Sequence, residues 1–108
     1  MSNNKRRHAL TKADIVDHIA SGTGLTKVET EAVVDGFIQT VIGALKEGKN
    51  IEIRGFGSFK TKKRKGRMAR NPRTGAQVKV EEHFVPFFKV SKELRAIVNE
   101  NLKKMQPH

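Results

Sequence analysis

The stretch between Lys60 and Lys79 limits what this chain can fold into more than any other part of the sequence. It contains no aspartate or glutamate, and positions 61–70 lack the alternating large apolar residues of a half-buried strand. A ribbon formed here has no face to bury, so we predict that it projects from the body of the protein. Its nine lysines and arginines stand at positions 60, 62, 63, 64, 65, 67, 70, 73 and 79.

The middle of this stretch has the composition of a tight turn. In the segment 71–75, asparagine favours the first turn position, proline fixes φ at the next, and glycine tolerates a positive φ. Val78 and Val80 then alternate with polar residues, which predicts a returning strand. The sequence therefore predicts a two-stranded arm over about residues 60–80.

The positive charge of the chain is concentrated in this arm. The formal net charge is +11, and outside the stretch the basic and acidic residues nearly balance. A concentrated positive stripe is typical of a protein that binds a polyanion, with nucleic acid as the first candidate and an anionic membrane surface as the second. Charge alone does not choose between these two partners.

Three helices are predicted, two before the strands and one after them. Thr11 is placed to cap the first helix, and Thr26 with Glu29 has the spacing of a capping box for the second. Apolar residues recur every three or four positions along the second helix until Gly48 stops it. Ser91 is placed to cap the last helix.

The strands lie between the second and third predicted helices. Ile51 and Ile53 alternate with charged residues as in a half-buried strand, and Phe59 begins a second strand. The apolar segment 84–88 contains Pro86, which predicts an edge strand or an irregular segment. Helices and strands in this order indicate an α+β fold in a single domain over residues 10–108, preceded by a flexible basic tail at 1–9.

Several classes of function find no support in the sequence. Without cysteine the chain has no disulfide or thiolate metal site, and its four scattered histidines make a metal site or cofactor unexpected. No apolar run approaches the roughly 20 residues of a membrane span, and the N-terminus lacks the apolar core of a signal peptide. No nucleophile–base pair or carboxylate pair indicates an enzyme or a small-molecule substrate. We therefore expect a cytoplasmic binding protein.

The predicted body is small for an independent core. Without the tail and the arm, roughly 80 residues remain, which is near the lower limit for a self-sufficient hydrophobic core. Six phenylalanines are many for such a body, and self-association would bury them. We therefore expect an obligate dimer that presents two arms.

Four motifs in order resemble one known family. GFGSF at 55–59, ARNPRTG at 69–75, VPFFK at 85–89 and SKELR at 91–95 resemble the bacterial HU and integration host factor family of DNA-bending proteins. IEIRGFGSF at 51–59 is more similar to the beta subunit of integration host factor than to HU. The resemblance implies an intertwined homodimer, or a heterodimer with a paralogue. Such a dimer has a helical base, an antiparallel β saddle and two β-ribbon arms that embrace double-stranded DNA in the minor groove.

The resemblance also implies roles for individual residues. Pro72, at the arm tip, is the intercalating wedge between base pairs, and Arg54, supported by Glu52, reads the minor groove. Lys12 and Lys92 lie near predicted helix N-termini, which favour phosphate, and Lys65 belongs to the basic stretch. The phenylalanines expected in the dimer core are Phe56, Phe59 and Phe88. The arm residues expected to line the groove and its phosphates are Lys62, Arg64, Arg67, Arg70, Asn71, Arg73 and Lys79.

Three functions remain open from the sequence. The leading one is a histone-like protein of the bacterial nucleoid that bends and compacts DNA with weak sequence preference, because the minor groove distinguishes little beyond A·T from G·C. A site-preferring protein of the integration host factor type is the alternative, supported by Arg54 and Glu52. A more remote possibility is an RNA-binding protein of the ribosomal type, whose basic arm would enter folded RNA.

Overall fold

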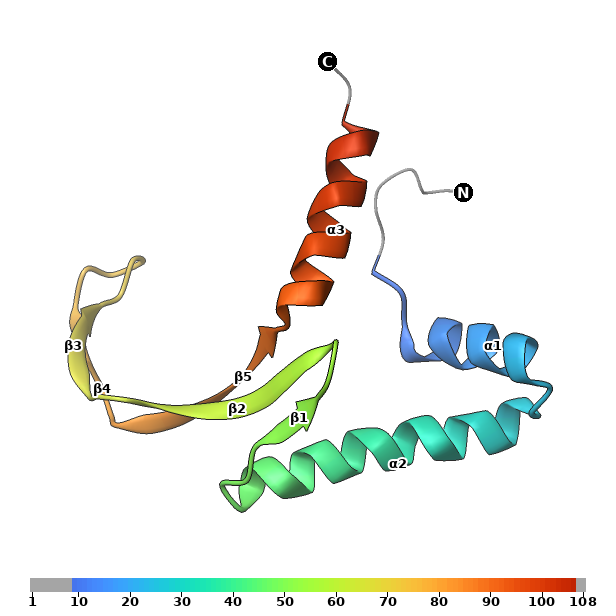
Figure 1. Ribbon diagram of the computed structural model, residues 1–108. Helices are drawn as coiled ribbons and strands as arrows, with labels where there is room; N and C mark the ends of the chain where they lie inside the picture. The colour runs from blue at the N-terminus through green and yellow to red at the C-terminus, as the bar shows by residue number, and fades with distance from the viewer. Residues whose placement is uncertain (1–8, 107–108) are drawn as a thin grey trace. The chain divides into compact units, whose positions relative to one another are not determined.

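The computed structural model describes residues 9–106, which form three α-helices and five β-strands (Figure 1). These residues belong to two compact units, one up to Thr40 and one from Val41 onward, and helix α2 contributes to both. The α+β class predicted from the sequence is confirmed. Eight residues of the predicted tail at 1–9 lie outside the described residues.

The first unit contains α1 (Lys12–Thr23) and the first part of α2 (Lys27–Lys46). The backbone N–H of Asp14 donates to Thr11 Oγ1 at 3.2 Å, and the backbone N–H of Thr11 donates to Asp14 Oδ2 at 2.9 Å. This reciprocal pair is a capping box, so the predicted start of the first helix is confirmed. Gly24 closes the helix in the left-handed region, with φ of 83°.

Helix α2 begins in the same way. The backbone N–H of Glu29 donates to Thr26 Oγ1 at 3.0 Å, and the backbone N–H of Thr26 donates to Glu29 Oε1 at 2.9 Å. At the other end, Gly48 has φ of 77° and its N–H donates to the carbonyl of Leu45 at 3.0 Å. Both predicted ends of this helix are therefore confirmed by local hydrogen bonds.

The second unit is built on an antiparallel sheet with strand order β1-β2-β5. The strands are β1 (Ile51–Ile53), β2 (Gly57–Arg64) and β5 (His83–Val90). β5 is an edge strand, and it accommodates Pro86, opposite Thr61, without a break in the pairing. The edge position predicted for the proline-containing segment is confirmed.

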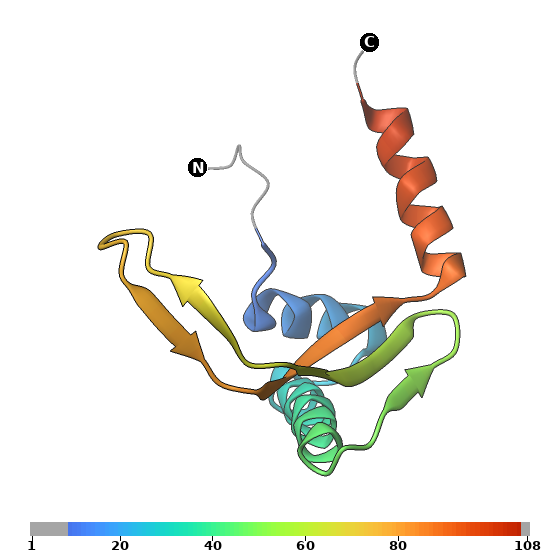
Figure 2. The ribbon, with the colours of Figure 1, turned by 90° about the vertical axis from the view of Figure 1, so that its left-hand side faces the viewer.

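Strand β1 pairs with β2 only as far as Phe59, so beyond that point β2 and β5 continue as a two-stranded ribbon. The ribbon passes a short break and continues as β3 (Arg67–Arg70) and β4 (Gln77–Val80), which pair only with each other (Figures 1 and 2). Nearly all side chains of β3 and β4 are exposed. The predicted arm is therefore present, and it projects beyond the three-stranded sheet.

Gly57 begins β2 at a place where a side chain does not fit. A Cβ atom at this position would collide with the ring of Phe88 and would lie 2.5 Å from the backbone oxygen of Lys89. The sequence predicted that this strand starts at Phe59. It starts two residues earlier, at Gly57, because glycine lets β5 approach closely.

Helix α3 (Lys92–Met105) follows β5 after one residue. Ser91 caps it: the N–H of Leu94 donates to Ser91 Oγ at 3.0 Å, as predicted. The N–H of Ser91 donates to the carbonyl of Phe56 at 3.0 Å. The start of the helix is thereby tied to the turn between β1 and β2.

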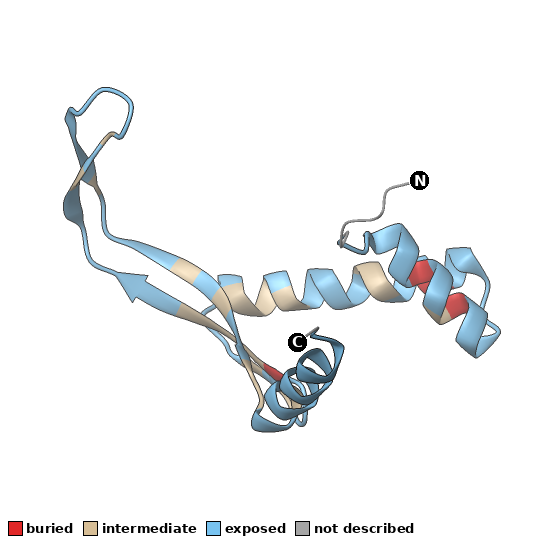
Figure 3. Cartoon of the chain, turned by 90° about the horizontal axis from the view of Figure 1, so that it is seen from above, coloured by how far each residue is buried: buried red, intermediate tan, exposed pale blue. Residues whose placement is uncertain are grey.

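Few side chains of the described residues are buried (Figure 3). The buried hydrophobic residues are Val16 and Ala20, with exposed fractions of 6% and 9%. A single chain thus leaves many large apolar side chains in contact with water. The large exposed apolar side chains include Val33, Phe37, Ile38 and Ile42 of α2 and Ile97, Val98 and Leu102 of α3.

Candidate nucleic-acid interface

The pairing of β2 with β5 sorts side chains between the two faces of the sheet. Residues directly opposite in an antiparallel pair point to the same face, and successive residues alternate. Phe59 lies opposite both Phe88 and Ile51, which defines an apolar face. The other face, called the cationic face below, carries Lys60, Lys62 and Arg64 of β2 and Lys89 of β5.

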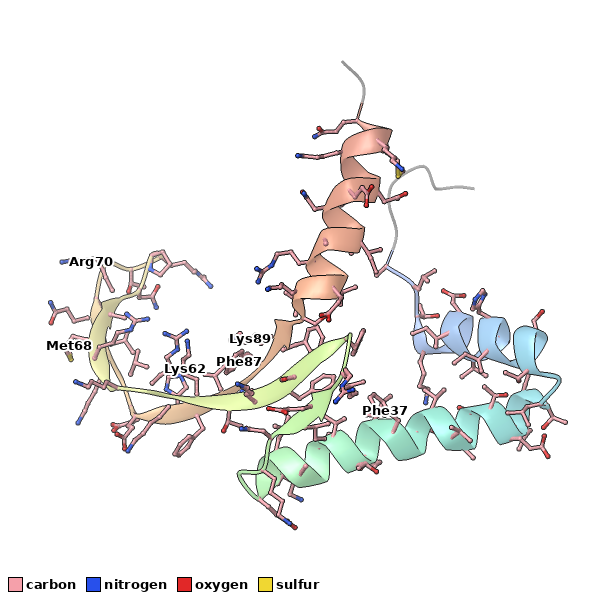
Figure 4. All side chains as sticks on the ribbon, viewed as in Figure 1. Phe37, Lys62, Met68, Arg70, Phe87 and Lys89 are labelled. Carbon is pink, nitrogen blue, oxygen red and sulfur yellow. The ribbon has the colours of Figure 1, made fainter. Side chains whose placement is uncertain are left out.

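Lys62 is held on the cationic face by an aromatic ring. Its Nζ atom lies 5.4 Å from the ring centroid of Phe87, which is within the range of a cation–π interaction. Figure 4 shows Lys62, Phe87 and Lys89 on the same side of the ribbon. The contact positions the ammonium group without neutralising it, so its charge remains available to an anionic partner.

The apolar face carries the phenylalanines predicted for the core. The ring centroid of Phe88 lies 5.0 Å from those of Phe56 and Phe59, with interplanar angles of 47° and 48°. Phe56 and Phe88 are still 44% and 38% exposed in the single chain. The structure therefore brings the three rings together, while their place in a dimer core stays a prediction.

The arm presents cations on both of its faces. Arg70 lies opposite Gln77 and Met68 opposite Lys79, so Arg70 and Lys79 share one face. Arg67 lies opposite Val80 on the other face, with Ala69 and Val78 beside it. Ala69, Val78 and Val80 therefore form a narrow apolar strip on the ribbon. The sequence pattern of 61–70 did not predict this strip, because two of its three residues come from the returning strand.

The turn at the arm tip is held by Asn71. Its side-chain Oδ1 accepts from the N–H of Arg73 at 2.8 Å, and its backbone carbonyl accepts from the N–H of Gly75 at 2.7 Å. Gly75 has φ of 75°, as predicted, and Arg70 Nη1 donates to the Gly75 carbonyl at 3.0 Å. Pro72 is exposed at the tip and is not needed for any of these hydrogen bonds.

Two of the arm lysines have acidic partners. Lys63 Nζ lies 3.3 Å from Glu82 Oε2, and Lys79 Nζ lies 3.7 Å from Glu81 Oε2. All four side chains are more than half exposed, so these ion pairs contribute little stability and can open when an anionic partner approaches. Lys79, a predicted DNA contact, is one of these paired residues.

Arg54 lies in the turn after β1, beside the cationic face. It lines a shallow groove together with Glu52, Lys60, Lys89 and Lys92. The groove therefore brings together two predicted contacts, Arg54 and Lys92. Lys60 and Lys89 were not among the predicted contacts. The alternation of side chains along β2 could have predicted Lys60 from Lys62. Lys89 can be assigned to this face only from the register between β2 and β5.

Lys12 belongs to the first unit and is engaged by carboxylates. Its Nζ lies 2.7 Å from Asp35 Oδ1 and 3.6 Å from Glu31 Oε2. The hydrogen bond to Asp35 raises the pKa of Lys12 above its ordinary value, and the nearby negative charges act in the same direction. Lys12 therefore remains charged near neutral pH, and its predicted contact with DNA would compete with this pair.

Residues 9–106 bring together no cluster of metal-ligating side chains. No three or more His, Cys, Asp or Glu side chains gather in this part of the chain in an arrangement that could hold one. None of the helices over the same residues is both long enough and apolar enough to cross a membrane.

Comparison with known proteins agrees with this geometry. Residues 10–99 match the family model described as "Bacterial DNA-binding protein". The chain is 45% identical to integration host factor subunit beta from Marinobacter nauticus over 96 residues, which are 88% of this chain and 98% of the relative.

Two solved structures of HU share the fold. HU from Anabaena in a cocrystal with DNA has a TM-score of 0.76 and 34% identity, covering 82% of this chain and 96% of that one. A variant of HU from Thermotoga maritima has a TM-score of 0.61 and 28% identity, covering 82% and 97%.

The fold and the cationic ribbon thus define an architectural DNA-binding protein of the bacterial, histone-like class. This chain belongs to the HU and integration host factor family of bacterial DNA-binding proteins.

The two faces of β2 allow a matched test of the interface. Lys62→Gln removes a charge from the cationic face, whereas Lys63→Gln removes the same charge from the opposite face. We expect Lys62→Gln to make the slope of log affinity against log salt shallower by about one unit for each phosphate that is no longer neutralised. Fluorescence anisotropy with a labelled duplex at several salt concentrations measures this slope.

Lys63→Gln should leave the slope unchanged, because its side chain points away from the cationic face. Equal effects of the two substitutions would show that DNA responds to the total charge of the ribbon, and that the cationic face is not the contact surface.

Proposed function

We propose that this protein is a dimeric, histone-like protein of the bacterial nucleoid that binds duplex DNA in the minor groove and bends it. Its two β-ribbon arms would enclose the duplex, and Pro72 would intercalate at the tip of each arm. The observation that carries this proposal is the projecting ribbon β3–β4, which has two exposed arginines on β3, one exposed lysine on β4 and an exposed proline at its end. Membership of a DNA-binding family supports DNA over RNA as the partner.

The chemistry of the arm favours binding to duplex DNA of any sequence over recognition of one specific base sequence. Lysines and arginines that meet phosphates release counterions, which supplies affinity that does not depend on sequence. The arm is narrow, and the minor groove that it would enter offers little information beyond A·T against G·C. The expected result is tight, salt-sensitive binding with weak sequence preference.

Pro72 has the properties of a wedge. Its ring is apolar and stiff, and it has no N–H that would need a partner between stacked bases. Wedges of this kind unstack a base step at a cost of a few kcal/mol and kink the duplex, which brings more DNA onto the protein. The turn does not depend on Pro72 for its hydrogen bonds, so the proline is free for this role.

A dimer would cover the apolar surface that one chain exposes. Phe37 and Ile42 of α2 are 47% and 44% exposed, and Ile97 of α3 is 65% exposed. Soluble monomers rarely expose so many large apolar side chains. We propose a homodimer, or a heterodimer with a paralogue, in which these faces and the phenylalanines of the apolar sheet face become a shared core.

A second candidate is a site-preferring bending protein. It is favoured by the groove in which Arg54 lies with Glu52, and by the similarity to an integration host factor beta subunit. A guanidinium group binds more favourably in a narrow minor groove, and the width of the groove depends on the DNA sequence.

Replacing Pro72 by Ala tests the wedge. We expect the bend, measured by energy transfer between dyes at the duplex ends, to decrease by at least about 20°, the lower end of kinks that apolar wedges produce. Most of the electrostatic affinity should remain, because no charge is removed. Pro86→Ala, the same change on an edge strand far along the ribbon, is the control and should leave the bend as it is. An unaltered bend in the Pro72 variant would refute intercalation.

The dimer predicts a thermal unfolding midpoint that depends on protein concentration. A tenfold increase in concentration should raise the midpoint by roughly 3–5 °C, because dissociation accompanies unfolding. Circular dichroism melts over a hundredfold range of concentration measure the shift, and sedimentation equilibrium gives the mass. A midpoint independent of concentration, with the mass of one chain, would contradict the dimer.

Competition separates the two candidate functions. Duplexes enriched from a random pool are titrated against bulk genomic DNA at physiological salt. A preference below roughly tenfold would exclude the site-preferring function. If a larger preference is found, Arg54→Lys should reduce it without changing the salt slope, because lysine keeps the charge but lacks the planar guanidinium fork.

A further inference from the structure

The ribbon bends at one point, called the elbow here, formed by residues 64–67 on one strand and 81–83 on the other. Regular pairing is interrupted there between β2 and β3 and between β4 and β5. Gly66 lets the two strands approach, since a Cβ atom on it would lie 2.9 Å from the carbonyl oxygen of Val80. The backbones of the two strands are therefore close together at the elbow, where the side chains themselves are exposed.

A basic hollow lies at the elbow. It is lined by Arg64, Lys65, Arg67 and His83, with Val85 as its apolar contribution. Arg64 and His83 are directly opposite in the register, so both side chains point to the cationic face. Three permanent cations and one imidazole therefore surround a hollow large enough for a single oxyanion.

The ring of His83 has a defined orientation. Its Nδ1 lies 2.8 Å from the backbone oxygen of Glu81. A carbonyl oxygen only accepts hydrogen bonds, so Nδ1 carries the proton and donates it. In the neutral ring Nε2 is then unprotonated, and it is the atom that receives the second proton.

The charges around this ring come from every element at the elbow. Arg64 of β2, Lys65 of the link and Arg67 of β3 are positive. The carboxylates of Glu81 and Glu82 are negative, but they are ion-paired with Lys79 and Lys63. The hollow therefore keeps a net positive charge, which suits an anionic group.

We infer that the elbow is a proton-linked phosphate site in which a backbone phosphate of DNA occupies the hollow and His83 takes up a proton as it binds. The proton comes from solvent to Nε2, and the resulting N–H donates to a phosphate oxygen while Nδ1 keeps its bond to Glu81. This inference rests on the proposed function, and it adds that DNA affinity depends on pH.

The direction in which DNA affinity changes with pH follows from the uptake of a proton on binding. Because binding consumes a proton, affinity rises as pH falls through the range where imidazole titrates, between about pH 8 and 6. Phosphodiesters, lysine and arginine keep their charges over this range. An exposed ion pair of this kind should give roughly two- to fivefold tighter binding for each arm at the lower pH.

The test compares His83→Gln, His83→Lys and His18→Gln in the full chain, with a labelled duplex at constant ionic strength from pH 6 to 8. His18 lies on α1 in the first unit, is exposed, and serves as the control histidine. We expect His83→Gln to bind at every pH with the weaker affinity that the unaltered protein has at pH 8. His83→Lys should bind at every pH with the tighter affinity that the unaltered protein has at pH 6. His18→Gln should keep the wild-type dependence.

The inference is overturned if His83→Gln keeps the full pH dependence, or if His83→Lys binds no better than His83→Gln at pH 8. In either case salt-sensitive DNA binding would persist, so the proposed function would stand. Failure of the unaltered protein to bind duplex DNA at any pH would instead overturn both.

Discussion

Eight residue pairs align β2 with β5, and this register decides what each face of the protein can do. The rings of Phe59 and Phe88 and the isoleucines of β1 fall on one face, and all lysines and arginines of the two strands except Lys63 fall on the other. A shift of one residue would turn the side chains of one strand to the opposite face, so that Phe59 and Phe88 would no longer lie on the same face. Gly57 protects the register at its inner end, since only a residue without a Cβ lets Phe88 and Lys89 pass so closely.

The features that were predictable from the sequence are those fixed by neighbouring residues. Capping at Thr11, Thr26 and Ser91 and the turn at 71–75 need only side chains a few positions away, so their hydrogen bonds follow from local spacing. The projecting arm was likewise evident from charge and the absence of an apolar alternation. Family resemblance then supplied the DNA partner, which charge alone did not distinguish from a membrane.

Contributions from the second strand were not predictable in the same way. Lys89 and His83 join the cationic face only through a pairing between positions that are far apart in the sequence. The elbow depends on the close approach of Gly66 to Val80, which could not be predicted from the local sequence pattern. The charge run therefore identified the arm correctly but not how its cations divide between two faces, nor which of them already have acidic partners.

The hydrogen bonds of the arm tip all begin and end between Arg70 and Ala76. The loop is consequently held from within, without a hydrogen bond to the helices or to the three-stranded sheet of the described residues. Its neighbours along the ribbon are free to diverge in length and composition while the tip geometry persists. For the same reason, this heptapeptide should be transplantable onto an unrelated hairpin, carrying its exposed proline with it.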